Sequence, residues 1–159
     1  MARAIVIRQY GGPEVLQAEE VEVGTPGPGE LRLRQTFAGV NFHDVYVRTG
    51  QYRTLTPPGI PGIEAVGVVE QVGPGLEGFA IGDRIGYITR EYGCYASERL
   101  LPARLALKLP PHVDDRTAAS LLLKGAGGSA PKRRANSISP RPAQRMRCWS
   151  RARRRGRWC

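Results

Sequence analysis

Short apolar stretches, separated by Gly and Pro, run through the first 124 residues of the chain. The clearest pattern lies in ELRLRQTFAGVNF, residues 30–42, where Leu31 and Leu33 alternate with Arg32 and Arg34. A period of two is typical of a strand with one dry face and one wet face. Five further stretches predict strands at residues 2–9, 15–23, 64–73, 83–89 and 94–101. Many short strands at close spacing predict a mainly β fold, a closed or partly open β-barrel.

Two other segments predict helices. The first is short and lies within HDVYVRTG, residues 43–50, where Asp44 is expected to cap the start and Gly50 to end the last turn. The second is DDRTAASLLLKG, residues 114–125, which begins with two acidic residues at its positive N-terminal end. Gly125 is expected to stop this helix in a left-handed conformation. Its central apolar run must bury against another element.

Charge divides the chain into two parts. The formal net charge is +10, but residues 1–124 hold 13 Lys and Arg against 14 Asp and Glu, whereas residues 125–159 hold 11 against none. The second part has no apolar period and few aliphatic side chains, so it is expected to be a disordered basic tail. Its Arg clusters with Trp149 and Trp158 leave open a nucleic-acid-binding arm. The favoured alternative is an accidental extension, such as a frameshifted remnant of a cofactor domain, which makes a nucleic-acid partner unlikely.

Cysteine usage and hydropathy indicate the compartment. Cys94, Cys148 and Cys159 have no metal-type spacing, and their odd number argues against a disulfide framework. No apolar run has the length of a membrane-spanning helix, and MARAIVIRQYGG does not resemble a signal peptide. A cytoplasmic protein without a membrane partner is expected.

Six motifs occur in a specific order: GGPEVLQ at 11–17, GVNFHDVYVRTGQY at 39–52, PGIEAVGVVEQVG at 61–73, GDRIGY at 82–87, GCYASE at 93–98 and AASLLLKG at 118–125. Together they resemble the N-terminal, GroES-like catalytic domain of the zinc-free NADPH:quinone oxidoreductases, the zeta-crystallin branch of the medium-chain dehydrogenase/reductase superfamily. The resemblance implies a GroES-like, partly open β-barrel with two short helices over residues 1–124. The Rossmann domain of complete members is expected to be absent, because GAGG at 125–128 follows no strand and precedes no helical pattern. Complete members form homodimers, and no oligomeric state is assigned to this chain.

The resemblance also indicates that no metal is bound. Zinc-dependent relatives have Cys at the position of Asn41 and His at that of Ile63, and a catalytic zinc needs about three protein ligands. A lone His43 is more typical of a packing or hydrogen-bonding residue than of a ligand. The prediction is a zinc-independent site.

Site residues follow from the same resemblance. It implies that Phe42, His43, Asp44, Val45 and Tyr46 line the nicotinamide side of an NADPH cleft, and that Asn41 adds a polar group there. Tyr46 or Tyr52 would donate a hydrogen bond to the oxygen of a quinone or enone substrate, and Lys124 would reach a cofactor phosphate.

Structural alternatives remain open for the polar residues of this segment. Asn41 could satisfy backbone groups, Asp44 could only cap the short helix, and Glu64 is expected to hold a backbone or Arg partner. Cys94 is expected to be a small core residue.

The functional prediction is a quinone oxidoreductase-like protein. In the complete enzyme NADPH would deliver hydride to a quinone or conjugated carbonyl, and this chain alone is expected to be an inactive fragment with weak or no NADPH binding. A GroES-like interaction module remains an alternative.

Overall fold

Seven strands and four helical segments make up residues 1–126, the part of the chain that the computed structural model describes. Their order is β1 (Ala2–Val6), η1 (Pro13–Val15), β2 (Gln17–Val21), β3 (Glu30–Ala38), α1 (Phe42–Thr49), β4 (Glu64–Val72), β5 (Arg84–Ile88), β6 (Glu98–Pro102), η2 (Ala103–Leu105), β7 (Leu107–Lys108) and α2 (Asp115–Ala126). The expectations for the tail, including its two Trp residues, lie outside the described residues. None of the helices in residues 1–126 has the length and apolar content needed to cross a bilayer.

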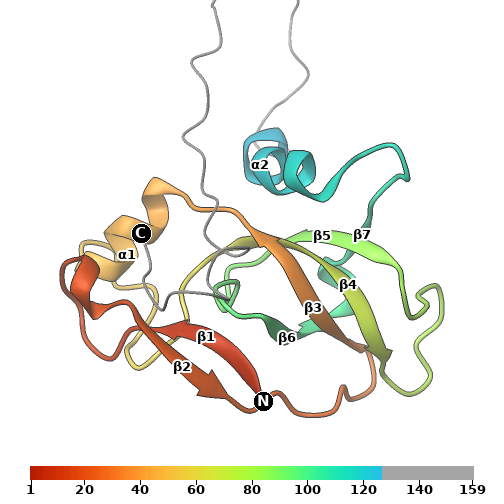
Figure 1. Cartoon of the computed structure of the whole chain (residues 1–159), viewed down its shortest axis with the longest axis horizontal. Coiled ribbons are helices and arrows are strands. Elements are labelled where there is room, and N and C mark those ends of the chain that lie inside the picture. Colours follow the sequence, from red (N-terminus) through yellow and green to blue (C-terminus); the bar gives the residue numbers. More distant parts are fainter. Residues whose placement is uncertain (127–159) are drawn as a thin grey trace, which may run out of the picture. The chain divides into compact units, whose positions relative to one another are not determined.

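The strands form two open antiparallel sheets rather than one closed barrel. β1 pairs with β2, and the larger sheet has the order β6-β3-β4-β5-β7 (Figure 1). The two sheets meet through a bridge between Ala4 and Ala96, and the Ser97 amide donates to the Arg3 carbonyl at 2.7 Å. The prediction of a mainly β fold with an incompletely closed arrangement and two α-helices is therefore confirmed.

The alternation along β3 sorts side chains as predicted. Leu31 and Leu33 are fully buried in the main core, which they share with residues of β4, β5 and β6. On the other face, Arg32 pairs with Glu98 at 2.6 Å and Arg34 with Glu70 at 2.9 Å. Full burial of a Leu side chain stabilises a fold by roughly 1.5–3 kcal/mol, whereas partly exposed ion pairs add about 0–1 kcal/mol. The apolar face thus holds the sheet together.

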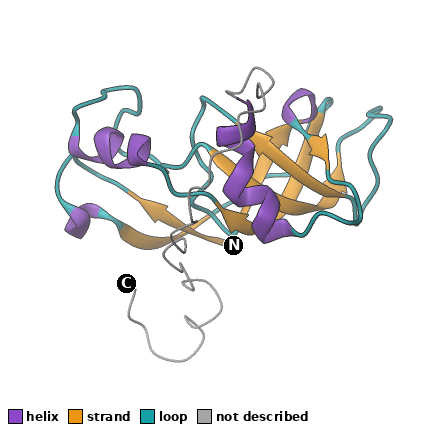
Figure 2. Cartoon of the chain, turned by 90° about the horizontal axis from the view of Figure 1, so that it is seen from above, coloured by secondary structure: helices purple, strands orange, loops and turns teal. Residues whose placement is uncertain are grey.

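Helix α2 covers one face of the larger sheet, as Figure 2 shows. Ala118 and Ala119 are buried against Val66 of β4, so the apolar run of this helix finds the partner that its pattern requires. The first turn is anchored by Asp115, whose carboxylate accepts hydrogen bonds from Arg84 Nε at 2.8 Å and Thr36 Oγ1 at 2.8 Å. The position of α2 over β3, β4 and β5 is thus fixed by both apolar and charged contacts.

The expectations about helix ends were confirmed in part. Asp44 does cap the start of α1, but from the third helical position: the N-cap residue is Asn41, and Asp44 Oδ2 accepts the Asn41 amide at 2.8 Å. Gly50 does end α1, with φ of 79°. Gly125 does not end α2, because the helix continues to Ala126 and Gly125 has no positive φ. Glycine permits a left-handed stop but does not impose one.

Candidate functional site

The predicted site residues 41–52 lie in the connection between β3 and β4, two neighbouring strands inside the larger sheet. This connection leaves the sheet after Ala38 and returns at Glu64, and the Gly39 amide donates to the Glu64 carbonyl at 3.1 Å. Both ends of the connection therefore meet at one point of the sheet, and α1 begins directly above it. The position of the N-terminus of α1 is therefore set by the ends of β3 and β4.

A buried carboxylate lies at this point. Glu64 is 2% exposed, and its Oε1 accepts a hydrogen bond from Asn41 Nδ2 at 2.8 Å. Its Oε2 accepts the backbone amide of Leu123 at 2.7 Å. The prediction of a backbone partner is confirmed, but the second partner is Asn41 rather than an Arg. Glu64 therefore joins the start of α1 to the last turn of α2.

Lys124 follows Leu123 and so lies near the same junction. Its side chain is exposed, and Nζ donates to the Ser120 carbonyl at 3.3 Å within the helix. The ammonium group is thus free to leave this weak contact for an anion at the surface.

Asp44 is a second buried carboxylate, 5% exposed, in the first turn of α1. Its Oδ2 accepts the Asn41 amide at 2.8 Å and the Tyr95 hydroxyl at 2.9 Å. Its Oδ1 is buried without a hydrogen-bond partner in the described part of the chain. Burial raises the pKa of Asp44 above its ordinary value, although these hydrogen bonds act in the opposite direction. Asp44 therefore organises the helix start and leaves one acceptor atom unused.

The outer surface of the connection is apolar and aromatic. Phe42 is 81% exposed, and Val45, Tyr46 and Tyr52 are each about two-fifths exposed, at 38%, 37% and 44%. The rings of Tyr46 and Tyr52 meet edge to face, with centroids 5.1 Å apart, and the Tyr52 amide donates to the Tyr46 carbonyl at 3.0 Å. The structure thus brings the two predicted catalytic tyrosines together, next to the exposed Phe42 and Val45. Below, we call these four residues the aromatic face.

His43 is half-buried and lies between Tyr52 of this face and Tyr92. Its Nε2 lies 3.2 Å from the hydroxyl of Tyr92, and its ring packs against Tyr92 and Tyr52. Among residues 1–126, no group of three or more His, Cys, Asp or Glu side chains is arranged to hold a metal ion. His43 is therefore placed to support its neighbours.

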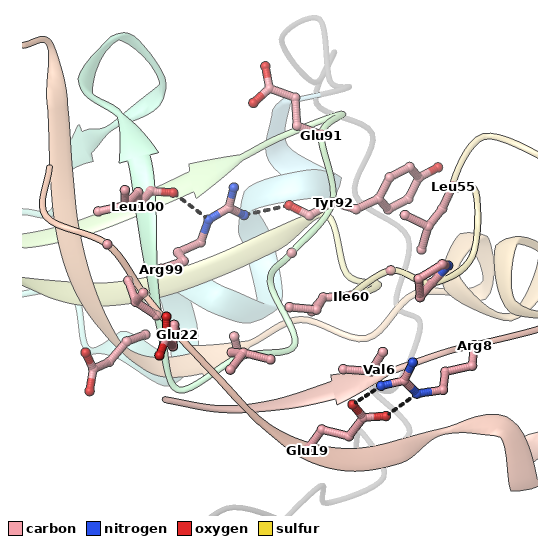
Figure 3. A pocket seen from close by; sticks show the side chains of 18 residues that line it. Val6, Arg8, Glu19, Glu22, Leu55, Ile60, Glu91, Tyr92, Arg99 and Leu100 are labelled. Carbon is pink, nitrogen blue, oxygen red and sulfur yellow. Dashed lines mark hydrogen bonds and ion pairs between the residues drawn. The ribbon is translucent and has the colours of Figure 1, made fainter. Parts of the chain in front are cut away.

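Two cavities lie elsewhere in the described part of the chain. One, of about 680 Å³, lies between the β1–β2 hairpin and residues 91–100 (Figure 3), and the other, of about 610 Å³, lies under α2 and is lined mainly by apolar side chains. None of residues 41–46 lines either cavity. The aromatic face thus lies outside both of these cavities, and its four side chains are exposed. A ligand bound there would need a second surface to cover it.

Three residues of this region were not predicted from the sequence: Thr54, Tyr92 and Tyr95. Their hydroxyls contact one another or the α1 residues across 38 to 51 positions of sequence. No local spacing reports such a contact. Cys94, by contrast, is fully buried as predicted, and burial raises the pKa of its thiol to about 11.

Known proteins resemble the chain over its described part. It is 46% identical over 130 residues to a 2-haloacrylate reductase of Burkholderia sp, covering 79% of this chain and 39% of that protein. It is 40% identical over 128 residues to a quinone oxidoreductase of Pseudomonas aeruginosa, covering 79% and 38%. The Escherichia coli quinone oxidoreductase crystallised with NADPH matches with a TM-score of 0.73 and 36% identity, again covering 79% and 38%. The chain thus spans about two-fifths of the length of these relatives.

The family model of the alcohol dehydrogenase GroES-like domain matches residues 27–111. This range begins in the loop before β3 and ends just before α2, so it includes α1 and the central strands that carry the aromatic face. On this match, together with the fold, the chain belongs to the alcohol dehydrogenase GroES-like domain family.

Proposed function

We propose that residues 1–124 form the acceptor-side wall of an NADPH-dependent hydride-transfer site that reduces quinones or other conjugated carbonyl compounds. The observation that supports this proposal most directly is the aromatic face. The start of the helix that bears most of this face is held by hydrogen bonds to the buried carboxylates of Asp44 and Glu64. Relatives named quinone oxidoreductase and 2-haloacrylate reductase support this choice, because a quinone and a 2-haloacrylate both carry a carbon–carbon double bond conjugated to a carbonyl group.

The face suits the nicotinamide end of the cofactor better than its phosphate end. Exposed Phe42 and Val45 offer an apolar surface for a planar ring. Lys124 is the nearest predicted contact for a phosphate. Every strand pairing in residues 1–126 is antiparallel, so this part lacks the parallel sheet of the fold that usually binds a pyrophosphate. Bound NADPH would supply the hydride.

The tyrosines would act on the acceptor. As hydride reaches the acceptor, negative charge develops on its oxygen, and a hydroxyl of Tyr46 or Tyr52 can stabilise that charge by donating a hydrogen bond. The edge-to-face contact between the two rings limits their rotation. Most of the binding energy of NADPH would come from its adenosine and phosphate half, so residues 1–124 alone are expected to bind it weakly and to turn over negligibly.

The test uses two preparations. In the first, the ¹⁵N-labelled 159-residue chain is titrated with NADPH and with duroquinone, a fully substituted quinone that does not alkylate thiols. Amide shifts are expected at residues 41–54. Shifts confined to the cavity beside the β1–β2 hairpin would contradict the proposal.

In the second preparation, residues 1–124 replace the matching segment of the Escherichia coli quinone oxidoreductase, and NADPH-dependent reduction of duroquinone and 2-chloroacrylate is measured. Loss of the Tyr52 hydroxyl in Tyr52→Phe is expected to lower kcat/KM about tenfold, as for one lost hydrogen bond to a developing charge. The matched control is Tyr10→Phe, because the Tyr10 hydroxyl donates only to the Leu55 carbonyl of the same connection. A folded chimera that binds NADPH but reduces neither acceptor would overturn the proposal.

A further inference from the structure

Tyr92 has an uncommon backbone conformation. Its φ is 58°, and no other non-glycine residue in the described range has a positive φ. The conformation is held by Arg99, whose Nη1 donates to the Tyr92 carbonyl at 2.7 Å and whose Nε donates to the Leu100 carbonyl at 3.0 Å. Figure 3 shows the guanidinium between these two carbonyls, with the Tyr92 ring pointing away from it. Backbone strain of this kind is concentrated at sites where side-chain placement matters.

The Tyr92 side chain makes two polar contacts at its tip. It is 6% exposed, and its hydroxyl lies 3.2 Å from His43 Nε2 and makes a short hydrogen bond with Thr54 Oγ1. His43 belongs to α1, and Thr54 belongs to the segment that follows it. One buried hydroxyl therefore braces the helix against the segment that carries Tyr52.

Ring contacts connect the buried Tyr92 hydroxyl to the surface. The His43 and Tyr92 rings stack at 8° with centroids 6.1 Å apart, and His43 packs at a tilt on Tyr52 with centroids 5.7 Å apart. Tyr52 then meets Tyr46 edge to face at 5.1 Å. Each separation lies within the range of favourable aromatic pairs. Four rings thus form a continuous row from the interior to the aromatic face.

We infer that Tyr92 is a positioning residue for the acceptor, acting through His43 and Thr54 to fix the orientation of Tyr52 beside Tyr46. This role deepens the proposed function and rests on it. The contacts of Tyr92 would set the distance between the Tyr46 and Tyr52 hydroxyls, which would meet the acceptor oxygen. A row of packed rings transmits a displacement because each ring is confined by the next one. Removing the hydroxyl at its buried end should therefore loosen Tyr52 at its exposed end.

The experiment uses four variants of the full 159-residue chain. Tyr92→Phe removes the hydroxyl and keeps the ring, and Thr54→Val removes its partner. Thr54→Ser restores that partner, and Tyr10→Phe is the control because its hydroxyl bonds to Leu55 in the same segment without touching His43. Each variant is titrated with duroquinone by NMR, its urea midpoint is measured, and cross-peaks between the His43 and Tyr52 rings are recorded.

Tyr92→Phe and Thr54→Val are expected to weaken duroquinone binding about threefold to tenfold, the effect of one net hydrogen bond. Both should also lose the cross-peaks between His43 and Tyr52. Thr54→Ser and Tyr10→Phe should keep the wild-type affinity and the cross-peaks. A purely structural role would lower the urea midpoint of Tyr92→Phe and Tyr10→Phe alike while leaving affinity and cross-peaks unchanged, and that result would overturn the inference.

The two proposals fail in different ways. If the wild-type chain does not bind duroquinone at residues 41–54, the proposed function fails. The cross-peaks still decide whether Tyr92 holds the His43–Tyr52 contact, because they need no ligand. Retention of these cross-peaks in Tyr92→Phe would disprove the positioning role in either case.

Discussion

Replacing Glu64 by Gln tests the buried junction between α1 and α2. The carboxylate accepts two hydrogen bonds, from Asn41 Nδ2 at 2.8 Å and from the Leu123 amide at 2.7 Å. A Gln side chain of the same shape has one oxygen, so if that oxygen accepts the Leu123 amide, its NH₂ group faces Asn41, whose amide must turn over to accept from it. Both hydrogen bonds then have a neutral acceptor. A hydrogen bond to a charged group contributes about 1.5–3 kcal/mol and a neutral one about 0.5–1.5 kcal/mol, so the two changes together cost roughly 2 kcal/mol.

This cost can be measured as a change in urea midpoint. With an m-value of roughly 2 kcal/mol/M for a small domain, a loss of about 2 kcal/mol lowers the midpoint by about 1 M. Unfolding is followed by far-UV circular dichroism at pH 7. The control is Glu70→Gln on the same strand, where a partly exposed pair with Arg34 contributes about 0–1 kcal/mol.

Hydrogen exchange gives a local measure of the same bond. The Leu123 amide should exchange faster in Glu64→Gln than in Glu70→Gln, because only the first variant replaces its carboxylate acceptor by a weaker amide acceptor. Equal midpoint losses in the two variants, together with an unchanged Leu123 exchange rate, would refute the role assigned to Glu64.

Three further predictions concern titrating groups. Burial raises the pKa of Asp44, so this carboxyl group binds a proton more readily in the folded chain than in the unfolded chain. The protonated group therefore stabilises the fold at acid pH, and this stabilisation is lost as the pH rises through the pKa of the folded state. Urea unfolding from pH 3 to 7 should therefore show wild type gaining stability relative to Asp44→Asn as pH falls, and a constant difference would contradict this. Asp83 should show the opposite sign, because the hydrogen bond from Lys108 lowers its pKa; the gap between wild type and Asp83→Asn should close at acid pH. Burial also raises the pKa of the Cys94 thiol from 9.0 to about 11. Alkylation of Cys94 by iodoacetamide at pH 8, mapped by mass spectrometry, should therefore be at least about 100-fold slower in the native chain than in urea. Equal rates would show that the thiol is accessible.

Much of the sheet could be predicted because its information is local. The alternation of Leu31 and Leu33 with Arg residues defines β3 and its buried face, and the glycine and proline positions separate the strands. The way the two open sheets meet could not be predicted, because it depends on pairings such as Ala4 with Ala96 that no local pattern records. The two-residue β7 is too short to produce a period. The predicted end of α2 at Gly125 was wrong, because this glycine keeps a helical conformation instead of the left-handed one that it could adopt.

The arrangement of the candidate site could be predicted in part for the same reason. Tyr46 and Tyr52 are close in the chain, so a resemblance over one motif could indicate both. The partners beneath them come from distant segments, and only the folded sheet brings Tyr92 to His43 or Leu123 to Glu64. Sequence motifs therefore indicated which residues share the exposed face, but not the buried residues from distant segments that hold them.

The connection between β3 and β4 departs from and returns to neighbouring points of the sheet, with Ala38 paired to Ala65 and Gly39 bonded to Glu64. The two anchoring points, together with the buried contacts of Asp44 and Val47, hold the connection in place whatever its exposed side chains are. Libraries at the exposed positions 42, 45, 46 and 52 could thus be built on one unchanged scaffold and selected for binding of different planar ligands. Glu64 and its hydrogen bond from Asn41 would stay the same in every member.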